Sequence, residues 1–256
     1  MKNVRLPKFL DYIPPVIAFV AAVVAIVGTS KWNENATGIY KVTPLGWMVL
    51  GIGLLALLAT LLITVRNSRE QTQQRHTRER IAAIGKKQLL GAILHTVHPL
   101  VGSSLWGRKC KPPETPEDFL NSERREILSS LELTAKSPYM DGSCEDILWH
   151  QIFQSAATEG SHQIITTLQI YSTYFPAEII EVATQYLNCE FLQMRLKHLT
   201  DVVDVNTHFA PNRPVLFFMV KEDEVHNQGY GEFWALLAQA MTLCGGKSSQ
   251  GRPLFD

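Results

Sequence analysis

Two long apolar runs near the start of the chain contain no Lys, Arg, Asp, Glu or His. At a rise of about 1.5 Å per residue, the second run, Leu45–Val65, is long enough to cross a hydrocarbon core of about 30 Å. The first run, Ile13–Thr29, is at the short end of the spanning range. The pattern therefore predicts a transmembrane helical hairpin with a short external loop at 30–44.

The pattern changes after the second run. Residues 66–80 are almost entirely polar and rich in helix formers, which favours a helical stalk continuing the second span. Apolar residues then return at helical spacing over 81–105. This predicts an amphipathic helix, packed on a core or on the membrane surface, that ends near Pro99 and Gly102.

The remaining sequence predicts further helices. Thr115 and Pro116, followed by acidic residues, form a start signal for a helix that should run to about Lys136. Later helices are expected from Ile147 to a break near Gly160, over 161–175, over 176–205, after Pro214 in the apolar run 214–220, and over 231–244. The fold class is therefore all-α, a transmembrane hairpin and polar stalk carrying a cytosolic helical bundle. The predicted organisation is a cytosolic segment (1–12), the hairpin (13–65), the basic stalk and amphipathic helix (66–106), a proline-rich linker (107–116), the helical domain (117–246) and a tail (247–256).

Positive charge is segregated along the chain. Basic residues precede the first run and a cluster of Arg and Lys follows the second, whereas the loop between them has little net charge. The positive-inside rule predicts that both termini are cytosolic, and this asymmetry with short loops favours a multi-pass protein of a bacterial inner membrane. A cleaved signal peptide is the alternative for the first run, although the second span follows it closely. The residues expected at the membrane interfaces are Tyr12, Trp32, Tyr40, Trp47, Arg66 and Arg69.

Composition and motif content argue against several classes of function. The formal net charge is +0, so no basic excess points to a nucleic-acid partner. The four cysteines form no Cys-x-x-Cys pair and are expected to be free thiols in a reducing compartment. No phosphate-binding loop, dinucleotide fingerprint, nucleophile elbow or His-Glu-x-x-His motif occurs. We therefore predict no cofactor and no catalytic residue, and a non-catalytic protein is favoured over an enzyme.

Two short motifs are weak candidates for metal ligands. His95 and His98 are close together around a helix, and Glu159 with His162 has the Glu-x-x-His spacing of di-iron bundles. A metal site needs further ligands, and the sequence indicates a helix end within or beside each motif. Surface or helix-dipole roles are therefore favoured for these residues, and no metal is assigned.

The function favoured by these patterns is a membrane-anchored scaffold or sensor whose cytosolic domain binds a protein partner. One alternative is a membrane-perturbing effector that assembles through small residues of the hairpin into a homo-oligomeric pore. The layout of a hairpin followed by helices resembles that of two-transmembrane effectors of bacterial conflict systems, although no motif is shared. A second alternative is a membrane-tethered metalloprotein or enzyme. The residues expected to contact a partner are Glu222, Asp223, Glu224, Phe233 and Trp234.

Overall fold

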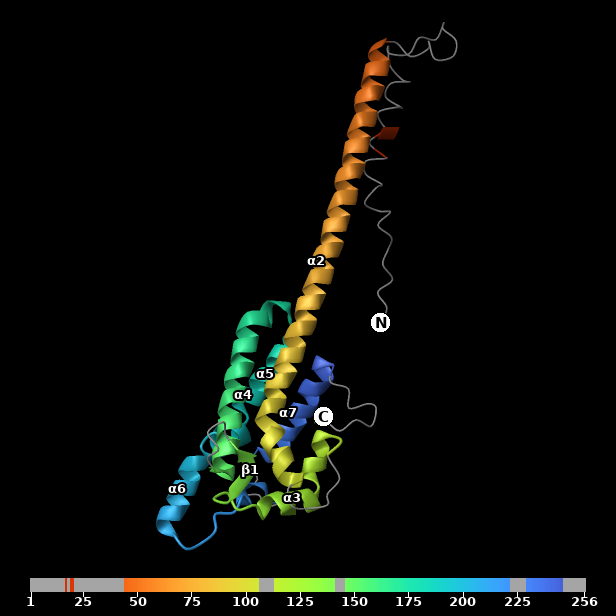
Figure 1. The fold of residues 1–256 in the computed structure, drawn as a ribbon. Coiled ribbons are helices and arrows are strands. Elements are labelled where there is room, and N and C mark those ends of the chain that lie inside the picture. The colour runs from red at the N-terminus through yellow and green to blue at the C-terminus, as the bar shows by residue number, and fades with distance from the viewer. Residues whose placement is uncertain are drawn as a thin grey trace. The chain divides into compact units, whose positions relative to one another are not determined.

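The computed structural model divides the chain into two compact units, Met1–Thr77 and Arg78–Asp256. Helices dominate the described residues, and their only sheet has two short strands (Figure 1). The helical class predicted from the sequence is therefore confirmed, with this small sheet as an addition. The predicted N-terminal segment, the tail and most of the first span, external loop and linker lie outside the described residues. The structure describes residues 17, 19, 20, 44–105, 113–140, 146–221 and 229–245.

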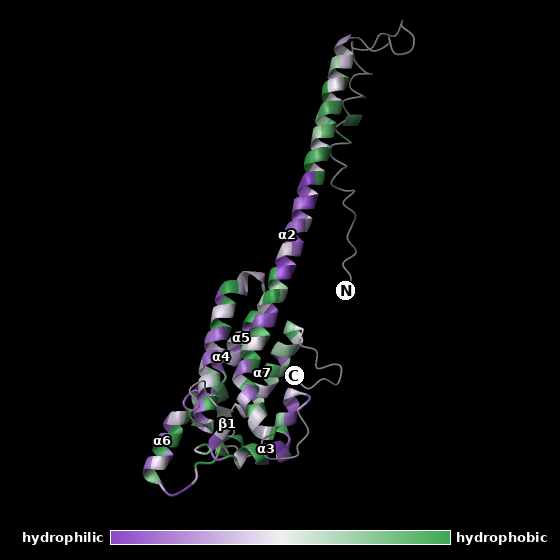
Figure 2. Ribbon diagram, in the orientation of Figure 1, coloured by the Kyte–Doolittle hydropathy of each residue, from purple (hydrophilic) through white to green (hydrophobic). Residues whose placement is uncertain are grey.

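Helix α2 (Pro44–Leu105) is a single helix that contains the second apolar run, the polar stalk and the amphipathic stretch. Figure 2 shows the change from apolar to polar residues along it. Among the described residues it is the one helix long and apolar enough to cross a membrane, and none of its most apolar stretch is buried. The stalk is helical as predicted, but the expected end near Pro99 and Gly102 is wrong. Pro99 is buried within the last turns, and the helix continues past it.

The C-terminal part of α2 packs in the core of the second unit rather than lying free. Its residues Leu89, Ile93, Val97 and Leu100 are almost completely buried. Hydrogen bonds connect it to other helices, including one between the hydroxyl groups of Thr96 and Tyr186. The amphipathic pattern therefore belongs to a core-facing helix, which was one of the two alternatives it left open.

The helix predicted from Pro116 to about Lys136 is replaced by shorter elements. The chain forms the 3-10 helix η3 (Pro116–Leu120) and the helix α3 (Ser122–Ser129), then the antiparallel strands β1 (Lys136–Met140) and β2 (Asp146–Leu148). Thr115 begins η3 with a capping box to Asp118, so the predicted start signal is correct. The helix stops early because residues 131–133 pair with the extended backbone at 215–217.

Helix α4 (Trp149–Tyr171) passes through Gly160 without the predicted break. A Cβ atom at Gly160 would lie 3.0 Å from the carbonyl oxygen of Ala92 and would overlap the side chain of Thr96. The glycine is therefore required by the close approach of α4 to α2, and its lower helix propensity is offset by that packing. Gly85 is a second such position, because a Cβ there would lie 2.7 Å from the ring of Tyr171.

The long helix predicted over 176–205 is divided into three elements, after a single 3-10 turn η4 (Ser172–Tyr174). These are α5 (Ala177–Asn188), a π-helical segment η5 (Phe191–Leu196) and α6 (Leu199–Phe209). The interruption after α5 has a packing cause. Gly229 has a φ of 76°, and a Cβ atom there would lie 2.9 Å from the backbone nitrogen of Phe191. The chain preceding the last helix thus packs directly on the bend between α5 and η5.

The apolar run 214–220 is mostly extended, so its assignment to a helix is wrong. Leu133 donates a backbone hydrogen bond to Val215, Phe217 donates one to Leu131, and only the short 3-10 turn η6 (Phe218–Val220) is helical. The last helix, α7 (Tyr230–Cys244), matches the prediction closely. It ends at Gly245, whose φ of 81° is the left-handed conformation expected of a glycine C-cap.

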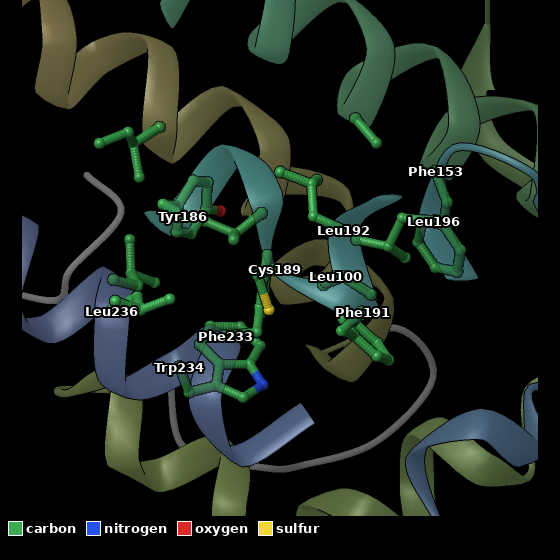
Figure 3. Close-up of a cluster of buried hydrophobic side chains, with 14 of the residues drawn as sticks. Leu100, Phe153, Tyr186, Cys189, Phe191, Leu192, Leu196, Phe233, Trp234 and Leu236 are labelled. Atoms are coloured by element: carbon green, nitrogen blue, oxygen red, sulfur yellow. The ribbon is translucent and has the colours of Figure 1, made fainter. Parts of the chain in front are cut away.

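Aromatic side chains fill the core of the second unit. Phe119 stacks on Trp234 with ring centroids 4.0 Å apart, and Tyr186 stacks on Phe233 at 5.1 Å. Figure 3 shows Tyr186, Phe233 and Trp234 with the aliphatic residues around them. Because these rings come from η3, α5 and α7, burying them fixes how the helices pack and hence the surface between α5 and α7.

Candidate functional site

A groove of about 560 Å³ runs between α5 and α7 on the surface of the second unit. Its volume lies within the range of about 300–1,000 Å³ that is typical of ligand sites. The two helices make extensive contact beneath it and lie side by side (Figure 1). The lining residues are Glu178, Glu181, Val182 and Gln185 of α5, with Ala238, Gln239, Thr242 and Leu243 of α7.

The local sequence explains why these side chains form a groove. On α5 the four lining residues have the i, i+3, i+4, i+7 spacing that places them along one face of a helix. A neighbouring face of α5 holds Ile179, Ala183 and Tyr186 in the core, and this fixes which side chains point outward. Small and uncharged residues on α7, including Ala238, leave space between the two helices.

Charge is distributed unequally around the groove. The α5 wall carries the exposed carboxylates of Glu178 and Glu181, whereas the lining residues of α7 are uncharged. Val182, Ala238 and Leu243 are half-buried and provide an apolar floor. An occupant with an apolar face and a cation on one side would therefore match it.

One cation lies close to the groove on a third helix. The Nζ of Lys86 in α2 donates a hydrogen bond of 3.3 Å to the carbonyl oxygen of Leu243, one of the lining residues. This ammonium group meets the C-terminal turn of α7, where the helix dipole favours a positive charge. Burial raises the pKa of the adjacent Cys244 thiol, and the charge of Lys86 acts in the opposite direction.

The structure brings together only part of the weak metal-ligand set. The Nε2 of His95 lies 3.6 Å from a carboxylate oxygen of Glu159, and both side chains are substantially exposed. His98 and His162 are exposed on α2 and α4. Within the described ranges, no three His, Cys, Asp or Glu side chains are grouped as a metal site requires. The observed pair is an exposed contact between two helices.

The expected partner-binding role of Phe233 and Trp234 is corrected by their burial. Their side chains are 0% and 1% exposed, and both belong to the aromatic core. Their apolar character reflected core packing of α7, which periodicity alone did not separate from an exposed contact. The acidic residues Glu222, Asp223 and Glu224 lie outside the described residues.

Of the expected membrane-interface residues, three are described. Trp47 is 51% exposed near the start of α2. Arg66 and Arg69 are exposed just beyond the apolar stretch, and Arg66 forms an ion pair of 2.9 Å with Glu70. Tyr12, Trp32 and Tyr40 lie outside the described residues. The assignment of all six residues to membrane interfaces stays a prediction.

A buried histidine connects α4 to α6. The Nδ1 of His150 lies 3.2 Å from the hydroxyl oxygen of Thr200, and the backbone nitrogen of Thr200 donates a hydrogen bond to Gln154. Burial lowers the pKa of His150, although the nearby charge of Asp204 opposes this shift. The arrangement is a polar contact between two helices.

The groove was not among the sites predicted from the sequence. Its two walls lie more than 50 residues apart in the chain, and only their packing creates the space between them. The signal present in the sequence was the pair of carboxylates on the outward face of α5, beside the apolar stripe. The chain matches no known protein family, and no curated protein or solved structure matches it.

Proposed function

We propose that this chain is a membrane-anchored helical module that binds a protein partner through the α5–α7 groove and performs no catalytic step itself. The observation that carries the proposal is the groove, because two parallel rows of side chains over an apolar floor suit a helix laid into it. The carboxylates on the α5 wall would select a partner helix with basic residues on one side.

The proposed anchor is the apolar N-terminal part of α2 together with the preceding apolar run. A Cβ atom at Gly53 would lie 3.8 Å from the ring of Phe19, so a residue of the first run lies against the second within the first unit. This supports a hairpin, and the segregated positive charge supports cytosolic termini and a bacterial inner membrane. In this arrangement the groove faces the cytosol.

The test is capture of a partner by the full-length protein from a mild-detergent extract of its native cells. Ala238→Trp fills the groove floor, and Ala235→Trp places the same ring on an exposed position of α7 outside the groove. We expect a stoichiometric partner with the wild-type chain and with Ala235→Trp, and its loss with Ala238→Trp. The proposal fails if no stoichiometric partner is recovered, or if both variants retain it equally.

The second candidate function, a homo-oligomeric pore, is favoured by one observation. A Cβ atom at Gly51 would meet no described atom within 4 Å, and apolar side chains such as Leu55 and Leu62 around it are exposed. This face of α2 is therefore open to the lipid or to another copy. Dye leakage from liposomes distinguishes the two functions, since an anchor leaves vesicles intact at high protein-to-lipid ratio and a pore does not.

A further inference from the structure

We propose that residues 246–256, which follow α7, bind the α5–α7 groove of their own chain and compete there with the partner. The competition with a partner rests on the proposed function, whereas the binding of the tail to the groove does not. The occupant is named on two grounds, the chemistry of the tail and the position from which it starts.

The chemistry of the tail matches that of the groove. Its sequence, GKSSQGRPLFD, places the cation of Arg252 close to the apolar pair Leu254 and Phe255. The groove places the carboxylates of Glu178 and Glu181 beside an apolar floor. An apolar pair on that floor would bring the guanidinium group to the acidic wall, where bidentate pairing with a carboxylate is available.

The tail also starts at the groove. Leu243 lines the groove, and Gly245, the C-cap of α7, follows two residues later. Leu254 lies nine positions after Gly245, and an extended chain of that length spans up to about 30 Å. The groove extends along α7 only from Ala238 to Leu243, a rise of about 8 Å. The apolar pair can therefore reach any part of the floor with chain to spare.

The short connection makes even weak binding effective. A short flexible linker gives an effective concentration of about 1 mM, so an intrinsic dissociation constant of about 0.1 mM would keep the groove about 90% occupied. A partner would then bind about tenfold more weakly than to a chain without the tail, because only the free fraction is competent. The tail would thus set the partner concentration at which the groove is filled.

The first test is photo-crosslinking in the full-length protein in nanodiscs, with benzoylphenylalanine replacing Phe255. We expect intramolecular adducts on the groove residues. Glu178→Lys combined with Glu181→Lys should weaken the intrinsic affinity of the tail about three- to tenfold, as loss of an exposed charge pair and its replacement by repulsion would, and so lower the occupied fraction from about 90% to about 50–75%. Glu126→Lys, on the exposed surface of α3, is the matched control and should leave the adducts unchanged. The proposal is overturned if the adducts lie outside the groove or join two chains. It is also overturned if the yield does not exceed that of a probe replacing Phe209.

The second test uses a chain ending at Gly245 and a fluorescent peptide of residues 246–256. Anisotropy should show saturable binding that Ala238→Trp abolishes and Ala235→Trp preserves, with unchanged circular dichroism in each variant. Absence of binding at about millimolar peptide contradicts the proposal. Partner capture by this shortened chain distinguishes failure of the tail proposal from failure of the proposed partner binding. Capture without peptide binding refutes the tail alone, and peptide binding without capture refutes the partner alone.

Discussion

Replacing Gly160 by alanine should destabilise the second unit, although alanine is the better helix former. Gly160 lies in the middle of α4, where glycine costs about 1 kcal/mol relative to alanine. Judged from the helix alone, Gly160→Ala would therefore be stabilising. The structure predicts the opposite sign, because α2 occupies the space that the added methyl group requires.

The magnitude follows from what the methyl group would meet. Its nearest neighbours include the carbonyl oxygen of Ala92 at 3.0 Å and the backbone nitrogen of Thr96 at 3.2 Å, both in the buried part of α2. Backbone atoms cannot rotate away as a flexible side chain can, so α4 must move away from α2. Overpacking of this kind costs about 1–3 kcal/mol. Contact with two backbone atoms places this site in the upper part of that range, at about 2–3 kcal/mol. Subtracting the propensity gain of about 1 kcal/mol leaves a net loss of about 1–2 kcal/mol.

Gly91→Ala is the matched control on α2. Gly91 is exposed, lies within the same compact unit and is also in the middle of a helix. A Cβ atom there would meet no described atom within 4 Å, so only the propensity gain remains. We expect Gly91→Ala to stabilise the unit by about 0.5–1 kcal/mol. The same substitution is thus predicted to have opposite signs at two positions.

The assay is urea unfolding of the full-length protein in detergent, followed by tryptophan fluorescence, with thermal unfolding as a second measure. For a unit of this size, 1 kcal/mol corresponds to about 2–4 °C in Tm. Thr96→Ser removes the methyl group nearest the added Cβ and keeps the hydroxyl, so it should recover part of the loss in Gly160→Ala. If Gly160→Ala stabilises the unit as much as Gly91→Ala, α4 does not pack on α2 at this distance.

Three further predictions concern the core. Phe119→Ala should lose about 3–5 kcal/mol in urea unfolding because the ring is fully buried against Trp234, whereas Phe209→Ala, at a side chain 82% exposed, should change little. Burial lowers the pKa of His150 in the folded protein, so the unfolded chain binds the proton more tightly. The free energy of unfolding should therefore fall as the pH drops below about 6.5. The urea midpoint measured against pH should show this fall, and His150→Gln should reduce it. Burial raises the pKa of the Cys189 thiol, so peptide mapping should find it unlabelled by maleimide at neutral pH until urea unfolds the unit.

The elements that the sequence predicted well have local causes. The apolar part of α2 follows from an uninterrupted run without charge, and the end of α7 follows from a glycine that adopts a positive φ. The start of η3 follows from Thr115 with proline and acidic residues after it. In each case the residues that determine the structure are adjacent in the chain.

The errors arose where distant residues decide the structure. The break expected at Gly160 is absent because α2 packs against that glycine, and α2 is remote in sequence. The run 214–220 lacked a visible partner because its partner, 131–133, had been assigned to a helix. The groove could not be predicted for the same reason, since α5 and α7 create it only by packing together. Phe233 and Trp234 were read as surface residues because apolar aromatics fit a core and an interface equally well.

The most direct measurement is the mass of the full-length protein in a mild detergent by mass photometry, with a fragment of residues 67–256 beside it. An apolar segment that serves as an anchor predicts particles holding one or two chains of 28.8 kDa, with the same stoichiometry in the fragment. A ring-sized assembly that forms only when the apolar segment is present would contradict this. The membrane segment would then be the working part of the protein, and the α5–α7 groove would not be its principal site.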